Sequence, residues 1–153
     1  MNVTNVGPCS ITNIRFLKMA SCNFKTFHAF LRNLTTLMHL DLSDNHIQGI
    51  VPNWIWKLHN LFILNVSNNL LTDLEGPLQN HTSNMLIVLD LHSNKLQGLV
   101  PFFPRGAESL DYSSNKFSSF IPRDIGNYMS RISFLSLSNN TLHGSIPDFL
   151  FNF

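Results

Sequence analysis

The stretch LDLSDNHIQGIVPNWIW (Leu40–Trp56) carries three structural signals within one short segment. Apolar residues at alternate positions predict a β-strand, because successive side chains of a strand point to opposite faces. Asn45 then predicts that the chain leaves the strand, and Gly49 and Pro52 predict a bend behind it. The segment therefore predicts one turn of a coil, and such a turn should recur along the chain.

The same pattern does recur, as apolar-x-x-apolar-x-apolar-x-x-anchor, where x is any residue. The anchor is the position that Asn45 takes in the first stretch. The anchor residues lie 21 to 25 residues apart, which is typical of a leucine-rich-repeat solenoid. We therefore predict one domain over residues 1–153, of about six repeats without recognisable caps. The copies are IRFLKMASC (14–22), with Cys as anchor, LMHLDLSDN (37–45), LFILNVSNN (61–69), LIVLDLHSN (86–94), AESLDYSSN (107–115) and ISFLSLSNN (132–140).

Each predicted strand divides its side chains between a core and an outer face. Leu40 and Leu42 should face the core, so the residues between and beside them face outward. Adjacent strands lie about 4.8 Å apart, so six of them make a sheet roughly 25 Å wide, which suits a peptide or a protein loop. The predicted ligand-binding residues are His39, Asp41, Ser43, Ile63, Asn65, Ser67, Val88, Asp90, His92, Ser109, Asp111, Ser113, Phe134, Ser136 and Ser138.

The anchor residues should form an internal ladder of side chains. Where the chain leaves the strand it exposes backbone donors and acceptors inside the coil, and a buried carboxamide can satisfy both kinds. A Cys side chain fits the same small buried volume but hydrogen-bonds weakly, so Cys22 should hold its turn less firmly. The predicted ladder comprises Cys22, Asn45, Asn69, Asn94, Asn115 and Asn140.

The overall composition excludes several classes of protein. With 44% hydrophobic and 12% charged residues, the chain has enough apolar material for a packed core. Its net charge of +1, with basic residues scattered among acidic ones, argues against a nucleic-acid-binding protein. Cys9 and Cys22 are too few for a disulfide-dense scaffold or a four-cysteine metal site, while one disulfide between them stays open. We expect neither a membrane anchor nor an export signal within this chain.

Two groups of residues invite a chemical function, and the spacing argues against both. His39, Asp41 and Ser43 are the types used in hydrolysis, but alternate residues of a strand lie about 6.6 Å apart, whereas a catalytic set converges within about 3 Å. Asp90, His92 and Asp111 could approach a metal ion from neighbouring strands, but no denser ligand cluster accompanies them. We therefore predict no enzymatic activity, no metal and no cofactor.

Several phrases carry a family resemblance. LSLSNNTLHGSIP (135–147) resembles the plant extracellular type of leucine-rich repeat, whose pattern is L-x-x-L-x-L-S-x-N-x-L-x-G-x-I-P. SCNF (21–24), LDYSSNKF (110–117) and IPRDIGNY (121–128) resemble more narrowly the ectodomain of receptor-like proteins of the tomato Verticillium-wilt resistance type. The resemblance implies a curved α/β-type horseshoe, with a parallel sheet on the concave face and short 3₁₀ and β segments on the convex side.

The same resemblance implies a function. It indicates a non-catalytic part of a cell-surface receptor that binds a protein or peptide ligand in defence or developmental signalling, together with a receptor-kinase co-receptor. The receptor would lie on the extracellular side of the plasma membrane, held by a transmembrane helix outside this chain. Two alternatives stay open: a secreted inhibitor resembling the plant polygalacturonase-inhibiting proteins, and a truncated gene remnant without activity.

Five Asn-x-Ser/Thr sequons give weak support for secretion: Asn2, Asn33, Asn65, Asn80 and Asn139. Asn33 and Asn80 are expected on return segments, where a glycan would be harmless. Asn65 is expected on the outer strand face, where a glycan would cover part of the binding surface. Asn139, beside the ladder, is intermediate, and we predict glycans at the last four of these sites.

Overall fold

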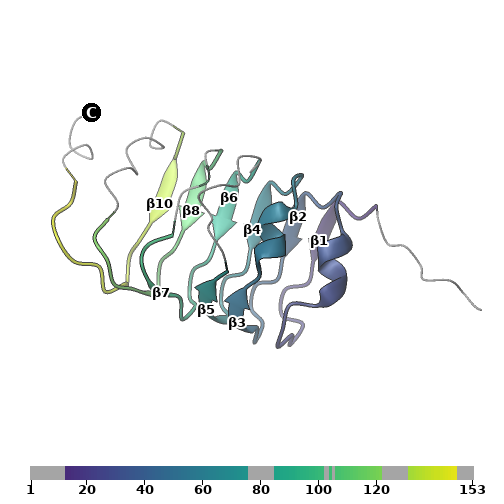
Figure 1. Cartoon of the computed structure of the whole chain (residues 1–153), viewed down its shortest axis with the longest axis horizontal. Coiled ribbons are helices and arrows are strands. Elements are labelled where there is room, and N and C mark those ends of the chain that lie inside the picture. The colour runs from purple at the N-terminus through teal and green to yellow at the C-terminus, as the bar shows by residue number, and fades with distance from the viewer. Residues whose placement is uncertain (1–12, 76–84, 102–103, 105, 122–130, 148–153) are drawn as a thin grey trace, which may run out of the picture.

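One short strand from each turn builds the main sheet of the solenoid (Figure 1). The computed structural model describes residues 13–75, 85–101, 104, 106–121 and 131–147. All neighbouring strands of this sheet are parallel, which confirms the predicted fold class. In spatial order they are β1 (Phe16–Lys18), β2 (His39–Asp41), β4 (Ile63–Asn65), β6 (Val88–Asp90), β8 (Ser109–Asp111) and β10 (Phe134–Ser136).

The six strands pair in perfect register. The middle residue of each strand faces the middle residue of the next, as Leu40 does with Leu64 and Leu64 with Leu89. Because alternate side chains share a face, equivalent positions of successive repeats form rows that run across the sheet. The register thus determines which outward side chains become neighbours.

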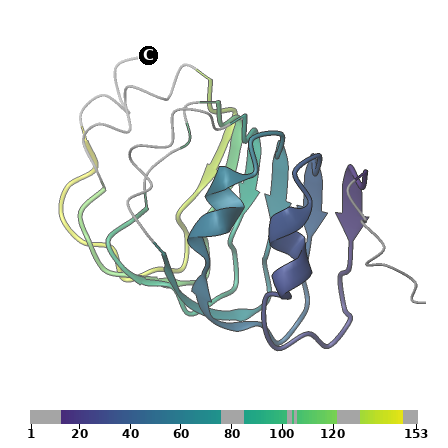
Figure 2. The same cartoon turned by 45° about the vertical axis from the view of Figure 1, so that its right-hand side comes forward.

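The return segments contain short elements of their own, as predicted. Two small parallel sheets pair β3 (Gln48–Val51) with β5 (Leu70–Leu74), and β7 (Gln97–Gly98) with β9 (Lys116–Phe117). Two 3₁₀ helices, η1 (Ala29–Asn33) and η2 (Asn53–Lys57), lie side by side on consecutive turns (Figures 1 and 2). Pro52 precedes η2 with φ −76°, the value that its ring imposes.

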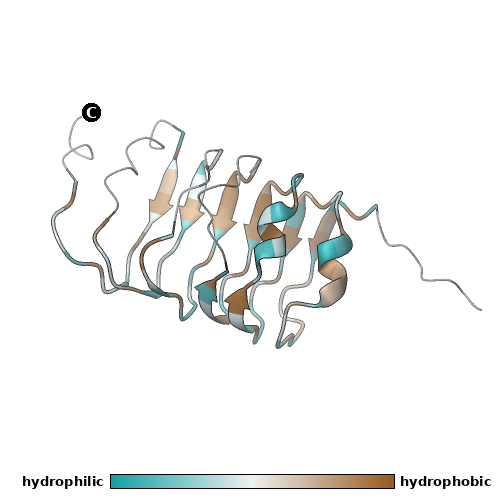
Figure 3. Ribbon diagram, in the orientation of Figure 1, coloured by the Kyte–Doolittle hydropathy of each residue, from teal (hydrophilic) through white to brown (hydrophobic). Residues whose placement is uncertain are grey.

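The core consists of the periodic apolar positions. Leu37, Leu40, Leu42 and Ile47 of one repeat are all 2% exposed or less. Burying one such side chain contributes about 1.5–3 kcal/mol. Hydrophobic residues accordingly follow the strands, with hydrophilic residues at the tips of several of them (Figure 3). Tyr112 takes one of these core positions, and its burial raises the pKa of its hydroxyl.

The Asn side chains bind consecutive turns together from the inside. The Asn69 Oδ1 accepts a hydrogen bond from the Ile47 amide of the preceding turn at 2.9 Å. Its Nδ2 donates to the Leu42 carbonyl of that same turn at 3.0 Å, and to the Val66 and Ser67 carbonyls of its own turn. One amide therefore satisfies backbone donors and acceptors from two turns at once.

The other anchors repeat this arrangement. Their Oδ1 atoms accept from the amides of Phe24, Leu71, Leu96 and Phe117 at 2.9–3.0 Å. Four of the five amide side chains are 9% exposed or less, and the fifth, in the turn of edge strand β10, is partly buried. The five anchor residues are Asn45, Asn69, Asn94, Asn115 and Asn140.

Cys22 does not take the buried place expected for it. It is exposed and has a free thiol, and its Sγ donates a hydrogen bond to the Ala20 carbonyl of its own turn, at 3.4 Å. The predicted burial is wrong because β1 is an edge strand, and no turn among the described residues packs against its outer side. The first ladder contact is made instead by the Cys22 amide, which donates to the Asn45 Oδ1 at 3.0 Å. Cys9, the other half of the disulfide left open, lies outside the described residues.

The residue immediately before each anchor has a left-handed backbone. The φ values lie between 51° and 56°, a region that small polar residues tolerate better than β-branched ones. This explains why only Ser, Asp or Asn stands at this variable position of the repeat. The residues concerned are Ser21, Asp44, Asn68, Ser93, Ser114 and Asn139.

The ladder predicts a large stability difference between two Asn-to-Ala variants. Asn69→Ala leaves the buried Ile47 amide and several carbonyls without a partner, and each unsatisfied buried group costs about 1–3 kcal/mol. We expect the free energy of unfolding to fall by about 3 kcal/mol or more, measured by chemical denaturation of the chain.

Asn60→Ala is the matched control, because Asn60 makes one exposed hydrogen bond, to the Thr35 carbonyl. We expect a loss of about 0.5 kcal/mol or less in this variant. Equal losses in the two variants would contradict a ladder that carries the fold.

Candidate ligand-binding face

The positions expected to face outward from the six-stranded sheet form three rows, which together we call the strand face. The first row contains Phe16, His39, Ile63, Val88, Ser109 and Phe134. The second row contains Lys18, Asp41, Asn65, Asp90, Asp111 and Ser136. The third row, just beyond the strands, contains Ser43, Ser67, His92, Ser113 and Ser138. Phe16 and Lys18 are absent from the sequence prediction, although aligning IRFLKMASC (14–22) with the other copies gives both.

The first row is mainly apolar and accessible. Phe16 and Phe134 at its two ends are 64% and 49% exposed, and the residues between them are half-buried. The Phe16 and His39 rings meet edge to face with their centroids 6.5 Å apart. This row offers a ligand an apolar contact surface from Phe16 to Val88, with Ser109 between Val88 and Phe134.

The second row stabilises the chain as it leaves each strand. The Asp41 Oδ1 accepts hydrogen bonds from the Ser43 amide at 3.0 Å and from its hydroxyl at 2.7 Å. Asn65 accepts the same pair from Ser67, at 2.9 and 2.7 Å. Such bonds from a side chain to the backbone two residues on are typical of Asx turns. Asp90 with His92, and Asp111 with Ser113, repeat the pattern.

Part of the predicted face is closed by this bonding. Ser43 and Ser67 are only 6% and 1% exposed, so the prediction that they face outward toward a ligand is wrong. Their hydroxyls turn back onto the second row because the Asp41 carboxylate and the Asn65 amide oxygen accept hydrogen bonds from them. His92 and Ser113 are half-buried and Ser138 is exposed, so the third row is accessible only toward the C-terminal end of the sheet.

The residues suggestive of hydrolysis do not form a catalytic set. Asp41 accepts the Ser43 hydroxyl directly, and His39 makes no side-chain hydrogen bond to either residue in the part of the chain that the structure describes. A hydrolytic triad needs the His between the other two side chains. The hydrogen bonds between Asp41 and Ser43 are those of an Asx turn.

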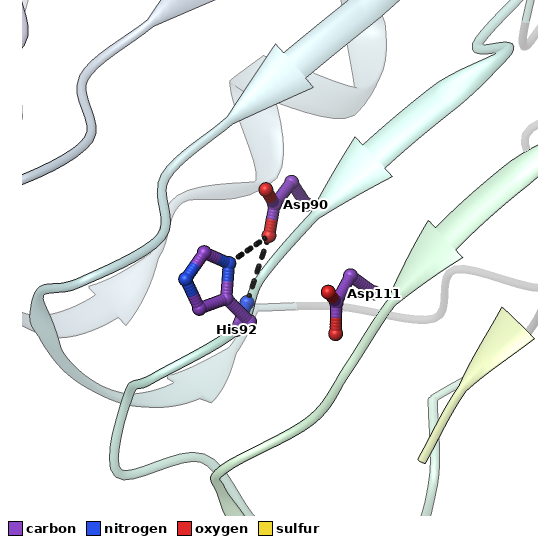
Figure 4. Close-up of side chains that lie close together, drawn as sticks. All are labelled: Asp90, His92 and Asp111. Atoms are coloured by element: carbon purple, nitrogen blue, oxygen red, sulfur yellow. Dashed lines mark hydrogen bonds and ion pairs between the residues drawn. The ribbon is translucent and has the colours of Figure 1, made fainter. Parts of the chain in front are cut away.

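Asp90, His92 and Asp111 do come together (Figure 4). One ligand atom from each lies within 4.8 Å of the others, and the His92 Nδ1 lies 2.7 Å from the Asp90 Oδ1. The side chains of His92 and Asp90 are 31% and 24% exposed. The group is therefore accessible from the strand face, and one edge of the imidazole is already occupied by Asp90.

The middle of the strand face carries uncompensated negative charge. In the ranges that the structure describes, the single ion pair is that of His92 with Asp90, and it is charged only when the imidazole is protonated. No Lys or Arg among these residues lies within 4.0 Å of Asp41 or Asp111. Lys18 supplies the one positive charge of the second row, at its N-terminal end.

His39 is held in its neutral form. Burial lowers the pKa of its imidazole, the positive charge of Lys18 lowers it further, and Asp41 opposes both effects. Because the ordinary value is 6.5, His39 is mainly uncharged at neutral pH. It therefore extends the apolar first row toward Phe16 instead of adding charge to it.

The sequons differ in their surroundings. Asn33 is exposed at the last residue of η1. Asn65 lies in the second row with its Oδ1 engaged by Ser67, and Asn139 is exposed but donates to the Ser114 Oγ at 3.1 Å. Asn2 and Asn80 lie outside the described residues. Glycosylation at any of these sites stays a prediction.

Comparison with known proteins agrees with the repeat and its plant type. Models described as leucine-rich repeat match residues 12–71 and 131–153. The chain is 37% identical over 150 residues to Receptor-like protein 7 of Arabidopsis thaliana, covering 96% of this chain and 15% of that protein. It is 38% identical over 146 residues to Receptor-like protein 6 of the same plant, covering 95% of this chain and 14% of that protein.

Solved structures of plant receptors are also similar to this chain. The ectodomain of the Arabidopsis receptor kinase HAESA, in complex with the peptide hormone IDA and the co-receptor SERK1, matches with a TM-score of 0.68 and 29% identity, over 80% of this chain and 20% of that one. The PEPR1–AtPEP1 complex matches with a TM-score of 0.67 and 28% identity, over 79% of this chain and 18% of that one.

The chain therefore belongs to the leucine-rich-repeat proteins of the plant receptor-like type, as its sequence predicts. This membership confirms the prediction that it is not an enzyme, because such ectodomain repeats are non-catalytic binding modules. The chain spans 14% to 19% of the length of the relatives Receptor-like proteins 6, 7 and 54. No helix among the described residues is both long and apolar enough to cross a membrane.

The electrostatics of the strand face predict a depressed His39 pKa that depends on Lys18. An NMR titration should place this pKa below 6.5, and Lys18→Ala should raise it by removing a neighbouring positive charge. Lys25→Ala, a charge change on the return segment of the same turn, should leave it unchanged.

The lowered pKa also sets a direction for stability. Since the folded-state pKa lies below the unfolded value, the His39 contribution to stability is complete above about pH 6.5 and is lost as the pH falls through the folded-state pKa. A His39 pKa at or above 6.5, or equal shifts in the two lysine variants, would overturn this account.

Proposed function

We propose that this chain is a single repeat array from the ectodomain of a plant cell-surface receptor-like protein, and that its strand face binds a protein or peptide ligand in defence or developmental signalling. The observation that carries the proposal is the strand face itself, where a mainly apolar row lies beside a polar row with three carboxylates, in uninterrupted register. The face is roughly 25 Å wide at about 4.8 Å per strand, which is large enough for an extended peptide or a protein loop.

Recognition on this face must come from side chains. The backbone groups of the inner strands are engaged by neighbouring strands on both sides, so a ligand cannot add a further strand to the middle of the sheet. The side chains of the first and second rows, with the C-terminal part of the third row, remain accessible to a ligand. Most of them are short. They are fixed by the sheet, or by hydrogen bonds with the residue two positions on in the same repeat, so little conformational entropy is lost on binding.

The similar structures support this proposal. The HAESA ectodomain is solved with a peptide hormone and a co-receptor, and a second similar chain, PEPR1, is solved with AtPEP1. By analogy the parent of this chain would act with a receptor-kinase co-receptor on the extracellular side of the plasma membrane. Its contact with the membrane would run through a transmembrane helix outside this chain, and no nucleic acid would be involved.

A selection from a random-peptide display library on the 153-residue chain tests where ligands bind. We expect the selected peptides to lose about tenfold or more in affinity, close to 1.4 kcal/mol, when Ile63→Ala and Val88→Ala are combined, because these residues adjoin in the first row. The measurement is the dissociation constant by calorimetry, on variants whose denaturation midpoints are shown to be similar.

The matched control combines Ile50→Ala and Leu99→Ala, which remove exposed apolar side chains from the return segments. We expect this double variant to bind the selected peptides as the unchanged chain does. If the control loses binding and the first-row variant keeps it, the strand face is not the binding surface.

A further inference from the structure

We propose, building on the function proposed above, that the strand face selects its ligand by a basic side chain. An Arg or Lys of the ligand would sit between Asp90 and Asp111, with an apolar ligand side chain beside it on Val88 and Ile63. The proposal concerns the centre of the strand face, where the second-row carboxylates adjoin the apolar first row.

The first argument is charge. Asp90 and Asp111 are register partners on adjacent strands, and like charges opposite one another destabilise a sheet. Among the described residues no Lys or Arg lies within ion-pair distance of either carboxylate, and His92 compensates Asp90 only when protonated. A cation from a ligand would remove this repulsion, so the site is electrostatically complementary to a basic partner.

The second argument is geometry. The Oδ1 of Asp111 is fixed by the amide and hydroxyl of Ser113, and the Oδ1 of Asp90 is fixed by the amide and ring of His92. The second carboxylate oxygen of each has no hydrogen-bond partner in the described part of the chain. The two carboxylates approach within 4.8 Å (Figure 4), a gap that a planar guanidinium with its several donors can bridge by charge-assisted bonds.

The third argument is the neighbouring apolar row. Val88 lies two residues before Asp90 on the same strand and the same face, about 6.6 Å away, and it adjoins Ile63 across the sheet. Residues two apart in an extended ligand have the same separation on one side. The strand face therefore matches a ligand element with an apolar residue and a basic residue two positions apart.

The charge of these carboxylates is separable from their role in folding. Asn65 occupies the same row and accepts the same two hydrogen bonds from Ser67 through its Oδ1, without a charge. Replacing Asp90 and Asp111 by Asn should therefore keep the turn bonds while removing both negative charges. This pair of changes isolates recognition from stability.

The test compares peptides selected from the random library. We expect those that bind the unchanged chain to be enriched in the apolar-x-Arg or apolar-x-Lys element. Replacing that basic residue by Gln, or combining Asp90→Asn with Asp111→Asn, should each weaken binding by about tenfold or more, and the two losses should not add. Raising the salt concentration should weaken the wild-type complex and affect the double variant less.

Asp44→Asn with Asp73→Asn is the matched control, because it removes two exposed acidic charges outside the strand face, and we expect it to leave binding unchanged. Peptides that depend on Ile63 and Val88 but lack a basic residue and ignore the Asp90 and Asp111 changes would overturn this inference and leave the proposed function intact. Peptides that ignore the whole strand face would overturn both. Calorimetry with Zn²⁺ alone tests a metal site instead. If Zn²⁺ binds the unchanged chain but not the Asp90→Asn and Asp111→Asn variant, and basic peptides are not preferred, the carboxylates hold a metal and the inference is overturned.

Discussion

The structure depends on one side-chain amide in each turn, placed where the chain leaves the strand. At that point the backbone has both unpaired donors and unpaired acceptors inside the coil, and a carboxamide offers an acceptor oxygen and two N–H donors on one short side chain. Asn94 accepts from the Leu71 amide and donates to the Val66 carbonyl, both of the preceding turn, and donates to the Leu91 carbonyl of its own turn. These bonds fix each turn against its neighbour, and the in-register sheet follows from that constraint.

The rows of the strand face are a consequence of this register. A row exists only because equivalent positions of successive turns pair in the sheet. When several turns carry an apolar or an acidic residue at one such position, these side chains adjoin across the sheet. The second row then serves two purposes. One oxygen of each carboxylate holds the departing chain, and Asn65 shows that this needs no charge. The negative charge of Asp41, Asp90 and Asp111 is therefore more than these turn bonds require, and the recognition proposed above would use that of Asp90 and Asp111.

Much of the fold could be predicted from the sequence because it depends on periodicity. The anchor spacing and the alternation of apolar residues are sufficient to predict the strands, the core and the Asn ladder. The departures arise where a local contact or a place in the array decides the outcome. Ser43 and Ser67 are buried by hydrogen bonds to their neighbours, and Cys22 is exposed because it belongs to an edge strand. The approach of Asp90 to Asp111 depends on strand register, which the alignment implies, but the fixing of their oxygens depends on side-chain geometry that no spacing encodes.

Hydrogen exchange in the native state tests the ladder most directly. The backbone amides of Ile47, Leu71, Leu96 and Phe117 each donate to the side-chain Oδ1 of an anchor Asn. If the ladder holds the coil together, these amides exchange as slowly as those of the central strands β4 and β6, through the same cooperative opening. Exchange of these four amides at the rate of exposed loop amides would show that they are hydrated, and would contradict the account.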